Sequence, residues 1–237
     1  MDKEIIQDTV KPIYLFADSR PLFLKIDEKP FLASVRHFIE AENPRAAYIG
    51  ASNGDDPVYY SIFEAAMENI GIRDCKMILS SFSEDSQKFL SEADIILLAG
   101  GSASRGWEVM ERTGLKEVIF DRYNGGAILM GVSAGAVHLG LFGWEEEDFD
   151  VQTFFYTFGL VPFIISAHDE ARAWEKLKKA VGFMGEHVPG LGIPSGGGLI
   201  YHPNHTIEPI QYPLEEFSIS DGKLCHNLLM PGQSIPT

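Results

Sequence analysis

The chain has 237 residues, of which 45% are apolar and 22% charged, a composition that suits one large globular domain with a sizeable core. Its 34 acidic and 19 basic side chains give a formal net charge of −15, which argues against nucleic acid or an anionic membrane as a partner because phosphates would be repelled. The two cysteines form no disulfide framework and have no metal-ligand spacing, so we predict no metal site.

The first part of the chain alternates short apolar runs with helical spacings of apolar residues. Predicted strands cover residues 12–17, 46–51, 76–79, 94–99 and 127–130. Predicted helices cover about 29–42, 57–70, 83–93, 107–111 and 115–123. This rhythm indicates an α/β fold, in which a mostly parallel sheet is covered by helices on both faces.

The pattern changes after residue 144, where an acidic loop spans residues 145–150. Beyond it we predict a β-prone segment at 151–158, a strand at 163–166, a helix over 169–183, and short strands over 190–230. No segment has the composition of an interdomain linker, so we predict a single domain over residues 1–237.

The uncharged stretch 126–144 is long enough to span a bilayer. It contains five glycines together with Ser133 and His138, and a tight turn within a sheet explains it better. The N-terminus also lacks the basic-then-apolar order of a secretory signal. We therefore expect a soluble, cytoplasmic protein.

The motif Gly131-Val132-Ser133-Ala134-Gly135 directly follows the apolar run 127–130. Strand, glycine-flanked serine and helix together predict a nucleophile elbow, a turn too sharp for large side chains two residues before and after the serine. The start of the following helix offers free N–H groups and a positive dipole end, which favour developing negative charge. We predict Ser133 as a nucleophile; the alternative is a small-residue joint between strand and helix.

A serine nucleophile needs a base, normally an imidazole. His138 follows Ser133 by more than one helical turn, so we predict a structural role for it. His168 ends the apolar run 163–167, which would place it on the same rim of the sheet as Ser133. We predict His168 as the general base; the alternative is a helix-cap histidine that bonds only locally.

The pair Gly100-Gly101 follows the predicted strand 94–99. Adjacent glycines allow two backbone N–H groups to point into one space, as an oxyanion hole requires. Glycine pairs at strand ends are also common turn residues, so both interpretations stay open.

Together, Gly100-Gly101, the Ser133 elbow, and the block Gly159-Leu160-Val161-Pro162-Phe163 with His168 five residues on resemble the S51 peptidases. That family is similar in fold to class I glutamine amidotransferases, with serine in place of their cysteine. The resemblance implies Ser133 as nucleophile, His168 as base, and the N–H groups of Gly101 and Ala134 as oxyanion donors. It places Gly100 and Ser102 beside the substrate. It implies a cofactor-free hydrolase of small peptides, with aspartyl or β-aspartyl dipeptides as candidates, and leaves a homo-oligomer open.

The chain departs from the family pattern at the position of an acid. Ser195, in Gly192-Ile193-Pro194-Ser195-Gly196, stands where the family's Gly-x-x-Glu-Gly carries a carboxylate. The acidic loop is the other source of an acid that could orient His168. The spacing from Ser133 slightly favours Asp148 over Glu147; a solvated acidic loop is the alternative.

Two further departures concern the substrate. Ser102-Ala103 follow the glycine pair, where the family usually has Asn and Thr. Of the family's Arg-rich block, which binds the substrate's acidic group, only Arg172 remains, so a preference for aspartyl peptides stays open.

Three hypotheses result. The leading one is a serine peptidase acting on small peptides through Ser133 and His168. A non-catalytic relative that binds a small ligand or partner in the same cleft is the second. The third is an esterase of the α/β-hydrolase type, for which 35 residues between Ser133 and His168 is a short distance along the chain.

Overall fold

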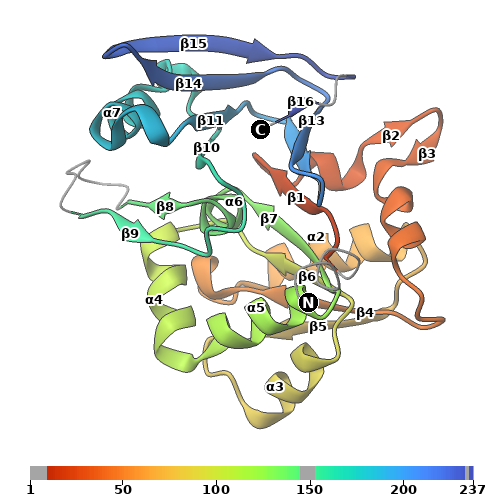
Figure 1. The fold of residues 1–237 in the computed structure, drawn as a ribbon. Helices are drawn as coiled ribbons and strands as arrows, with labels where there is room; N and C mark the ends of the chain where they lie inside the picture. Colours follow the sequence, from red (N-terminus) through yellow and green to blue (C-terminus); the bar gives the residue numbers. More distant parts are fainter. Residues whose placement is uncertain (1–9, 145–152, 233–234, 237) are drawn as a thin grey trace, which may run out of the picture.

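The computed structural model describes residues 10–144, 153–232 and 235–236. Its largest sheet contains the strands β1 (Ile13–Phe16), β4 (Arg45–Ile49), β5 (Asp74–Ile78), β6 (Ile95–Leu98), β7 (Ile128–Val132), β12 (Gly198–Tyr201), β13 (Thr206–Ile210) and β16 (Ile235–Pro236). Their order is β16-β13-β12-β1-β7-β6-β4-β5 (Figure 1). The strands β1, β7, β6, β4 and β5 run parallel to one another. β12, β13 and β16 extend the sheet beyond β1 by antiparallel pairing. The predicted α/β fold with a mostly parallel sheet is confirmed.

Both faces of this sheet are buried. In β1, Ile13 and Leu15 join one core while Tyr14 and Phe16 join the other, as the alternation of side chains along a strand requires. The first face is covered by α3 (Glu84–Ser91), α4 (Ala103–Thr113), α5 (Leu115–Asn124) and α6 (Ala134–Leu139). The second is covered by α2 (Pro57–Glu68) and the 3-10 helices η1 (Arg20–Phe23) and η2 (Phe31–Phe38). Burial on both faces explains why the strands read as continuous apolar runs.

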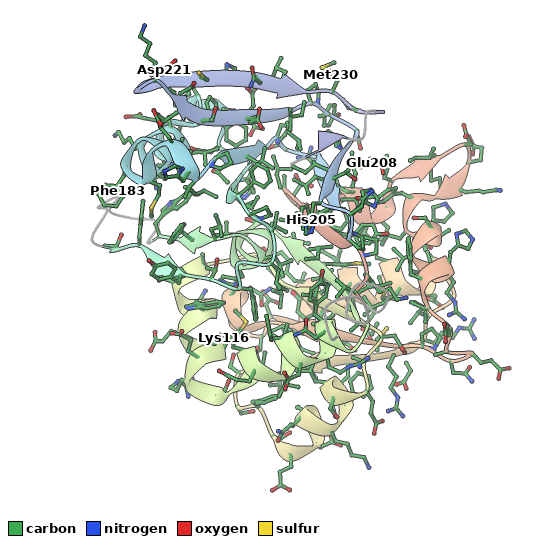
Figure 2. The ribbon with its side chains drawn as sticks, in the orientation of Figure 1. Lys116, Phe183, His205, Glu208, Asp221 and Met230 are labelled. Atoms are coloured by element: carbon green, nitrogen blue, oxygen red, sulfur yellow. The ribbon has the colours of Figure 1, made fainter. Side chains whose placement is uncertain are left out.

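A second sheet lies beside the first, in the order β10-β11-β14-β15. Its strands are β10 (Ile164–Ala167), β11 (Gly190–Ile193), β14 (Leu214–Ser220) and β15 (Lys223–Leu229), and α7 (Glu175–Met184) packs on it through Leu177 and Val181. Figure 2 shows Asp221 in the turn of the β14–β15 hairpin and Met230 just beyond its end, at the outside of the molecule.

The expectation that His168 ends a strand of the same sheet as Ser133 is wrong. The free edge of β1 is taken by β12, which pairs antiparallel with it. The strand before His168, β10, instead pairs in parallel with β11 in the second sheet. The histidine therefore approaches the serine from a separate layer.

Two predicted helices differ in form. In place of the predicted helix over 29–42, the structure has the 3-10 helix η2 over residues 31–38. A small hairpin of β2 (Lys25–Ile26) and β3 (Lys29–Pro30) comes directly before η2. The segment 169–183 is broken into the 3-10 turn η5 (Glu170–Arg172) and α7, because Ala173 and Trp174 have positive φ. That break turns the Trp174 side chain into the core of the second sheet, against Gly192.

Between α6 and β10 the chain forms a short hairpin of β8 (Phe142–Gly143) and β9 (Phe155–Tyr156). The uncharged stretch 126–144 thus folds as a strand, a six-residue helix and the first arm of this hairpin. In the described ranges, no helix has both the length and the apolar character that a bilayer crossing needs. Two short 3-10 turns, η3 (Ala51–Asn53) and η6 (Gly185–His187), lie between the other elements.

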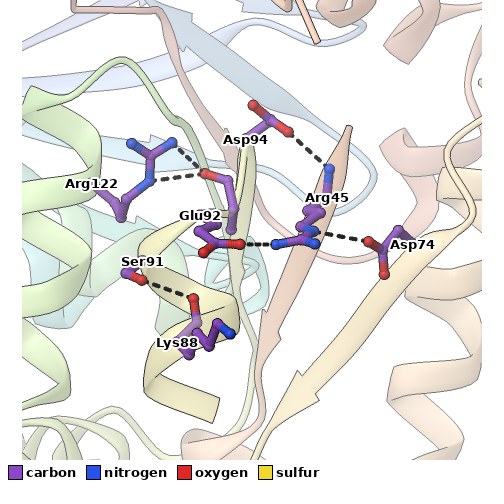
Figure 3. Close-up of polar contacts among 8 residues, drawn as sticks. Arg45, Asp74, Lys88, Ser91, Glu92, Asp94 and Arg122 are labelled. Carbon is purple, nitrogen blue, oxygen red and sulfur yellow. Dashed lines mark hydrogen bonds and ion pairs between the residues drawn. The ribbon is translucent and has the colours of Figure 1, made fainter. Parts of the chain in front are cut away.

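A polar cluster ties together the amino ends of β4, β5 and β6 (Figure 3). The Arg45 guanidinium pairs with Asp74 and Glu92, and its backbone N–H donates to Asp94 over 2.9 Å. Arg122 donates to the carbonyl oxygen of Ala93. Exposed pairs of this kind contribute little individually to stability, because solvent screens their attraction. These contacts lie at the amino ends of the strands, whereas Ser133 lies at the opposite edge of the sheet, at the carboxyl end of β7.

Candidate active site

Ser133 occupies the turn between β7 and α6. Its φ of 50° and ψ of −111° form a combination that residues other than glycine rarely adopt. The turn is fixed by backbone hydrogen bonds: the Ser133 N–H donates to the Phe16 carbonyl, and the Ser133 carbonyl accepts from Ala136 and Val137. This strained backbone is the one expected of a residue in so sharp a turn.

The glycine after the serine allows α6 to lie directly on the sheet. A Cβ atom at Gly135 would stand 2.0 Å from the carbonyl oxygen of Leu98 in β6, which is far closer than real contacts. The requirement for glycine that the motif predicted thus has a steric cause, the close approach of helix and strand.

His168 follows β10 of the second sheet, and its side chain contacts Ser133, which follows β7 of the main sheet. Its Nε2 lies 2.7 Å from the Ser133 Oγ, a hydrogen-bond distance. The His168 N–H donates to the Ile193 carbonyl over 2.9 Å, which fixes the residue at the end of the second sheet. The expected proximity of the two side chains is confirmed, although they come from different sheets.

His138 has the structural position that its spacing predicted. Its ring is buried, and its Nε2 lies 2.8 Å from the Ala103 carbonyl oxygen, an acceptor for a ring N–H. Burial lowers the pKa of this imidazole to about 4, despite the opposing effect of that hydrogen bond. His138 is therefore neutral at neutral pH.

Gly101 lines a cavity together with Ser133, and Ala134 follows Ser133 directly in the chain; among the described residues, neither backbone N–H donates to a loop or turn carbonyl. Ala134 is the first residue of α6, where N–H groups have no partner within the helix. Gly101 has a φ of 133°, and a Cβ there would meet the Ser52 carbonyl oxygen at 2.2 Å. Gly100 packs against the serine, since its Cβ would stand 3.2 Å from that of Ser133.

Ser102 caps the helix that follows the glycine pair. Its Oγ accepts a hydrogen bond from the Arg105 N–H over 3.3 Å at the start of α4. A serine at this position is a common N-cap, and this bond engages the hydroxyl.

Two cavities meet at the Ser133–His168 pair. The first, of about 250 Å³, lies on the side of Gly100 and Gly101 and is lined mainly by apolar side chains of α2 and the strand ends. The second, of about 530 Å³, lies on the side of Ala134 and β10 and includes Asp169, Arg172 and Lys176 in its lining. A substrate bound across the serine would extend into both.

Arg172 lies in the lining of the second cavity, with an exposed side chain 3.9 Å from a carboxylate oxygen of Asp169. The other carboxylate oxygen of Asp169 is buried without a hydrogen-bond partner in the described residues. Within the same residues, no group of three or more His, Cys, Asp or Glu is placed to hold a metal ion.

The acid that would orient His168 is the least defined part of the site. Asp148 and Glu147 lie outside the described residues. Within them, no carboxylate hydrogen-bonds the His168 ring, whose bond is to Ser133.

Glu170 is the carboxylate near His168 that sequence reasoning missed. Its Oε1 accepts a hydrogen bond from the Ser195 N–H over 3.1 Å. Partial burial would raise the pKa of Glu170, but the hydrogen bonds from Ser195 and its own backbone, together with the nearby His168 ring, lower it overall. Its position two residues after His168 was a signal, but the link to Ser195 is visible only in the fold.

A model of peptidase family S51 matches residues 25–208. The chain belongs to peptidase family S51. It is 30% identical over 182 residues to peptidase E of Streptomyces coelicolor, a match that covers 71% of this chain and 72% of that protein. It is also 29% identical over 110 residues to the uncharacterized peptidase YgaJ of Bacillus subtilis, which is 45% of this chain and 44% of YgaJ.

Solved structures agree with the S51 assignment at the level of the fold. A crystal structure of a peptidase from an acI-B1 Actinobacterium superposes with a TM-score of 0.71 at 16% identity, covering 96% of this chain and 97% of that one. A candidate peptidase E from Listeria monocytogenes EGD-e gives a TM-score of 0.54 at 15% identity, with coverages of 92% and 98%. The resemblance that the motifs indicated is therefore confirmed.

Proposed function

We propose that this S51 peptidase is a serine hydrolase of small peptides, with Ser133 as nucleophile and His168 as general base. The observation that carries the proposal is the 2.7 Å separation of the Ser133 Oγ and His168 Nε2, at the point where two cavities meet. A nucleophile and base within hydrogen-bond reach are what this chemistry requires.

In the proposed reaction, neutral His168 takes the Ser133 hydroxyl proton as Oγ attacks the peptide carbonyl. The N–H groups of Gly101 and Ala134 donate to the resulting oxyanion. The imidazolium then gives its proton to the departing amine, leaving an acyl-enzyme. Water, deprotonated by the same ring, releases the acid and restores the serine.

The proposed substrates are short peptides, and an acidic group on them is proposed to face Arg172. The guanidinium is exposed in the second cavity, where it could pair with a substrate carboxylate, either an aspartyl side chain or a chain terminus. The peptidase E name of the Streptomyces relative supports peptides as the class. Location in the cytoplasm stays a prediction.

A fluorophosphonate probe tests the nucleophile. We expect the wild type to be labelled, Ser133→Ala to be unlabelled with an unchanged circular dichroism spectrum, and His168→Gln to be labelled far more slowly. Labelling that persists in Ser133→Ala would place the nucleophile elsewhere. A wild type that stays unlabelled while folded would favour the non-catalytic, ligand-binding alternative.

A further inference from the structure

We propose that the first cavity binds an apolar side chain of the peptide, aromatic or branched aliphatic, next to the bond that Ser133 attacks. The inference rests on the proposed function only in taking Ser133 as the reacting position. The cavity reaches the Ser133–His168 pair and is walled by Leu22, Phe63, Leu97, Ala99 and Val132. Such a lining favours burial of apolar surface over that of a carboxylate.

The size of the cavity suits a side chain of this kind. An apolar cavity of about 150 Å³ can hold benzene, and this one is about 250 Å³. Phe63 and Leu97 are almost completely buried, so these two walls belong to the core that α2 forms with the sheet. We therefore expect these walls to be rigid and to need little rearrangement on binding.

Asp18 is the one carboxylate among the described residues that line this cavity, and it is not free to bind a substrate cation. The Asp18 Oδ1 accepts from the backbone N–H and the Nε of Arg20, both over 2.9 Å. Its Oδ2 accepts from the Arg20 Nη2 and, over 2.8 Å, from the Gly196 N–H. Four donors fill the sites that a carboxylate offers.

The described lining of this cavity offers an acidic side chain no free Lys or Arg partner. Partial burial would raise the pKa of Asp18, but its hydrogen bonds from Arg20 and Gly196 and the charge of Arg20 lower it, so Asp18 is ionised at neutral pH. Apart from His168, no basic side chain is among the described residues of the lining. An aspartyl group there would lose water without gaining a free cationic side chain, because Arg20 is already paired with Asp18.

Two further polar side chains of the lining, Tyr48 and Asn53, bond to each other, and Ser19 and Tyr59 also contribute to the lining. The Asn53 amide donates to the Tyr48 hydroxyl over 2.8 Å, and its oxygen accepts from the Asp56 N–H over 3.2 Å. Because Tyr48 and Asn53 are paired, their polar groups add little to the polarity of a lining that is mainly apolar. The two cavities thus differ in chemistry, with Arg172 on one side of the serine and an apolar pocket on the other.

Binding to the inactive Ser133→Ala protein tests this proposal without relying on turnover. Two series of dipeptides are compared. In one series the first residue is phenylalanine, leucine, alanine or aspartate and the second is alanine; in the other series the first residue is alanine and the second is varied. At one of the two positions we expect phenylalanine and leucine to bind at least about tenfold more tightly than aspartate, as burial of one large apolar side chain predicts. Equal binding, or aspartate preferred at both positions, would overturn the proposal.

A charge placed in the cavity, with a matched control, locates the effect. Ile62 of α2 lines the cavity, whereas Ser61 is exposed and is absent from its lining. Ile62→Lys should abolish the preference for phenylalanine and Ser61→Lys should retain it. An Ile62→Lys protein that still prefers phenylalanine would place the apolar site elsewhere.

The same proteins separate this proposal from the proposed function. If the wild type is not labelled by fluorophosphonate but the phenylalanine preference is present, the proposed hydrolase function is rejected and the proposed apolar pocket is supported. If labelling depends on Ser133 but aspartate is preferred at both positions, the hydrolase function is supported and the apolar pocket is rejected.

Discussion

The His168 ring presents one nitrogen to Ser133, so its other nitrogen is the position at which an acid could act. During attack the ring becomes an imidazolium, which a nearby carboxylate stabilises. In a serine protease the loss of that acid lowers turnover about 10⁴-fold. Asp148, Glu147 and Glu170 are the candidates here, and spacing along the chain favours Asp148.

We expect Asp148→Asn to lower the kcat of peptide hydrolysis by about 10²-fold or more, with a smaller change in KM. Glu147→Gln and Glu170→Gln serve as matched controls and should stay within a few-fold of the wild type. The measurement is steady-state kinetics across pH for each folded variant. A large loss in Glu170→Gln would assign the role to that residue, and no loss in any variant would leave a Ser–His dyad.

At the scale of single residues, the close approach of Ser133 and His168 was predictable because each residue follows an apolar strand in a recognisable motif. The lining of the pocket was not. The bond from Gly196 to Asp18 joins residues 178 positions apart, and nothing in either local sequence indicates it. Such contacts depend on which strand ends the fold brings together.

Two helices carry the proposed oxyanion donors at their amino ends. Gly101 lies just before α4 and Ala134 begins α6. His138 of α6 joins them, because its ring bonds the carbonyl of Ala103, the first residue of α4. The histidine that sequence reasoning set aside thus helps to fix the separation of the two helix starts.

This link predicts a dependence of stability on pH. The folded-state pKa of His138 is about 4, below the unfolded value of about 6.5, so the unfolded chain binds the proton more readily. The free energy of unfolding should therefore fall as the pH drops from about 6.5 to about 4, by up to about 3 kcal/mol from this group. Urea unfolding at pH 7 and pH 5 measures the effect, and His138→Gln should show a smaller loss. An equal loss in wild type and variant would contradict this origin.

The two sheets share one core. The cluster that contains Leu98 and Leu129 of the main sheet also contains Ile165, Leu191 and Leu214 of the second. Side chains packed across the boundary make separate unfolding of either sheet costly.

We expect one cooperative unfolding transition, as the prediction of a single domain requires. Trp107 packs on the main sheet and Trp174 in the core of the second, so two variants in which one of these residues is the sole tryptophan, with Trp144 replaced in both, report on each layer. Their fluorescence midpoints in urea should coincide with each other and with the far-ultraviolet circular dichroism midpoint. Two distinct midpoints would show two independently folding units.

The main sheet was predictable from sequence because its parallel strands are buried on both faces and flanked by amphipathic helices. The strands of the second sheet were also expected, but their pairing into a separate sheet was not, because they are short, glycine-rich or half-exposed, and the periodicity of β10 does not say which edge it will join. Pairing between distant strands decides that, and it also decides the direction from which His168 reaches the serine.

Both members of the Ser133–His168 pair have a positive φ, 50° and 46°. Such a backbone costs a residue with a side chain about 1–3 kcal/mol, whereas glycine adopts it freely. The fold therefore holds the proposed reactive pair against the conformational preference of these two residues, and replacement of either residue by glycine would relieve the strain. A lineage released from selection for hydrolysis would have a thermodynamically easy route to losing this pair while keeping the fold intact.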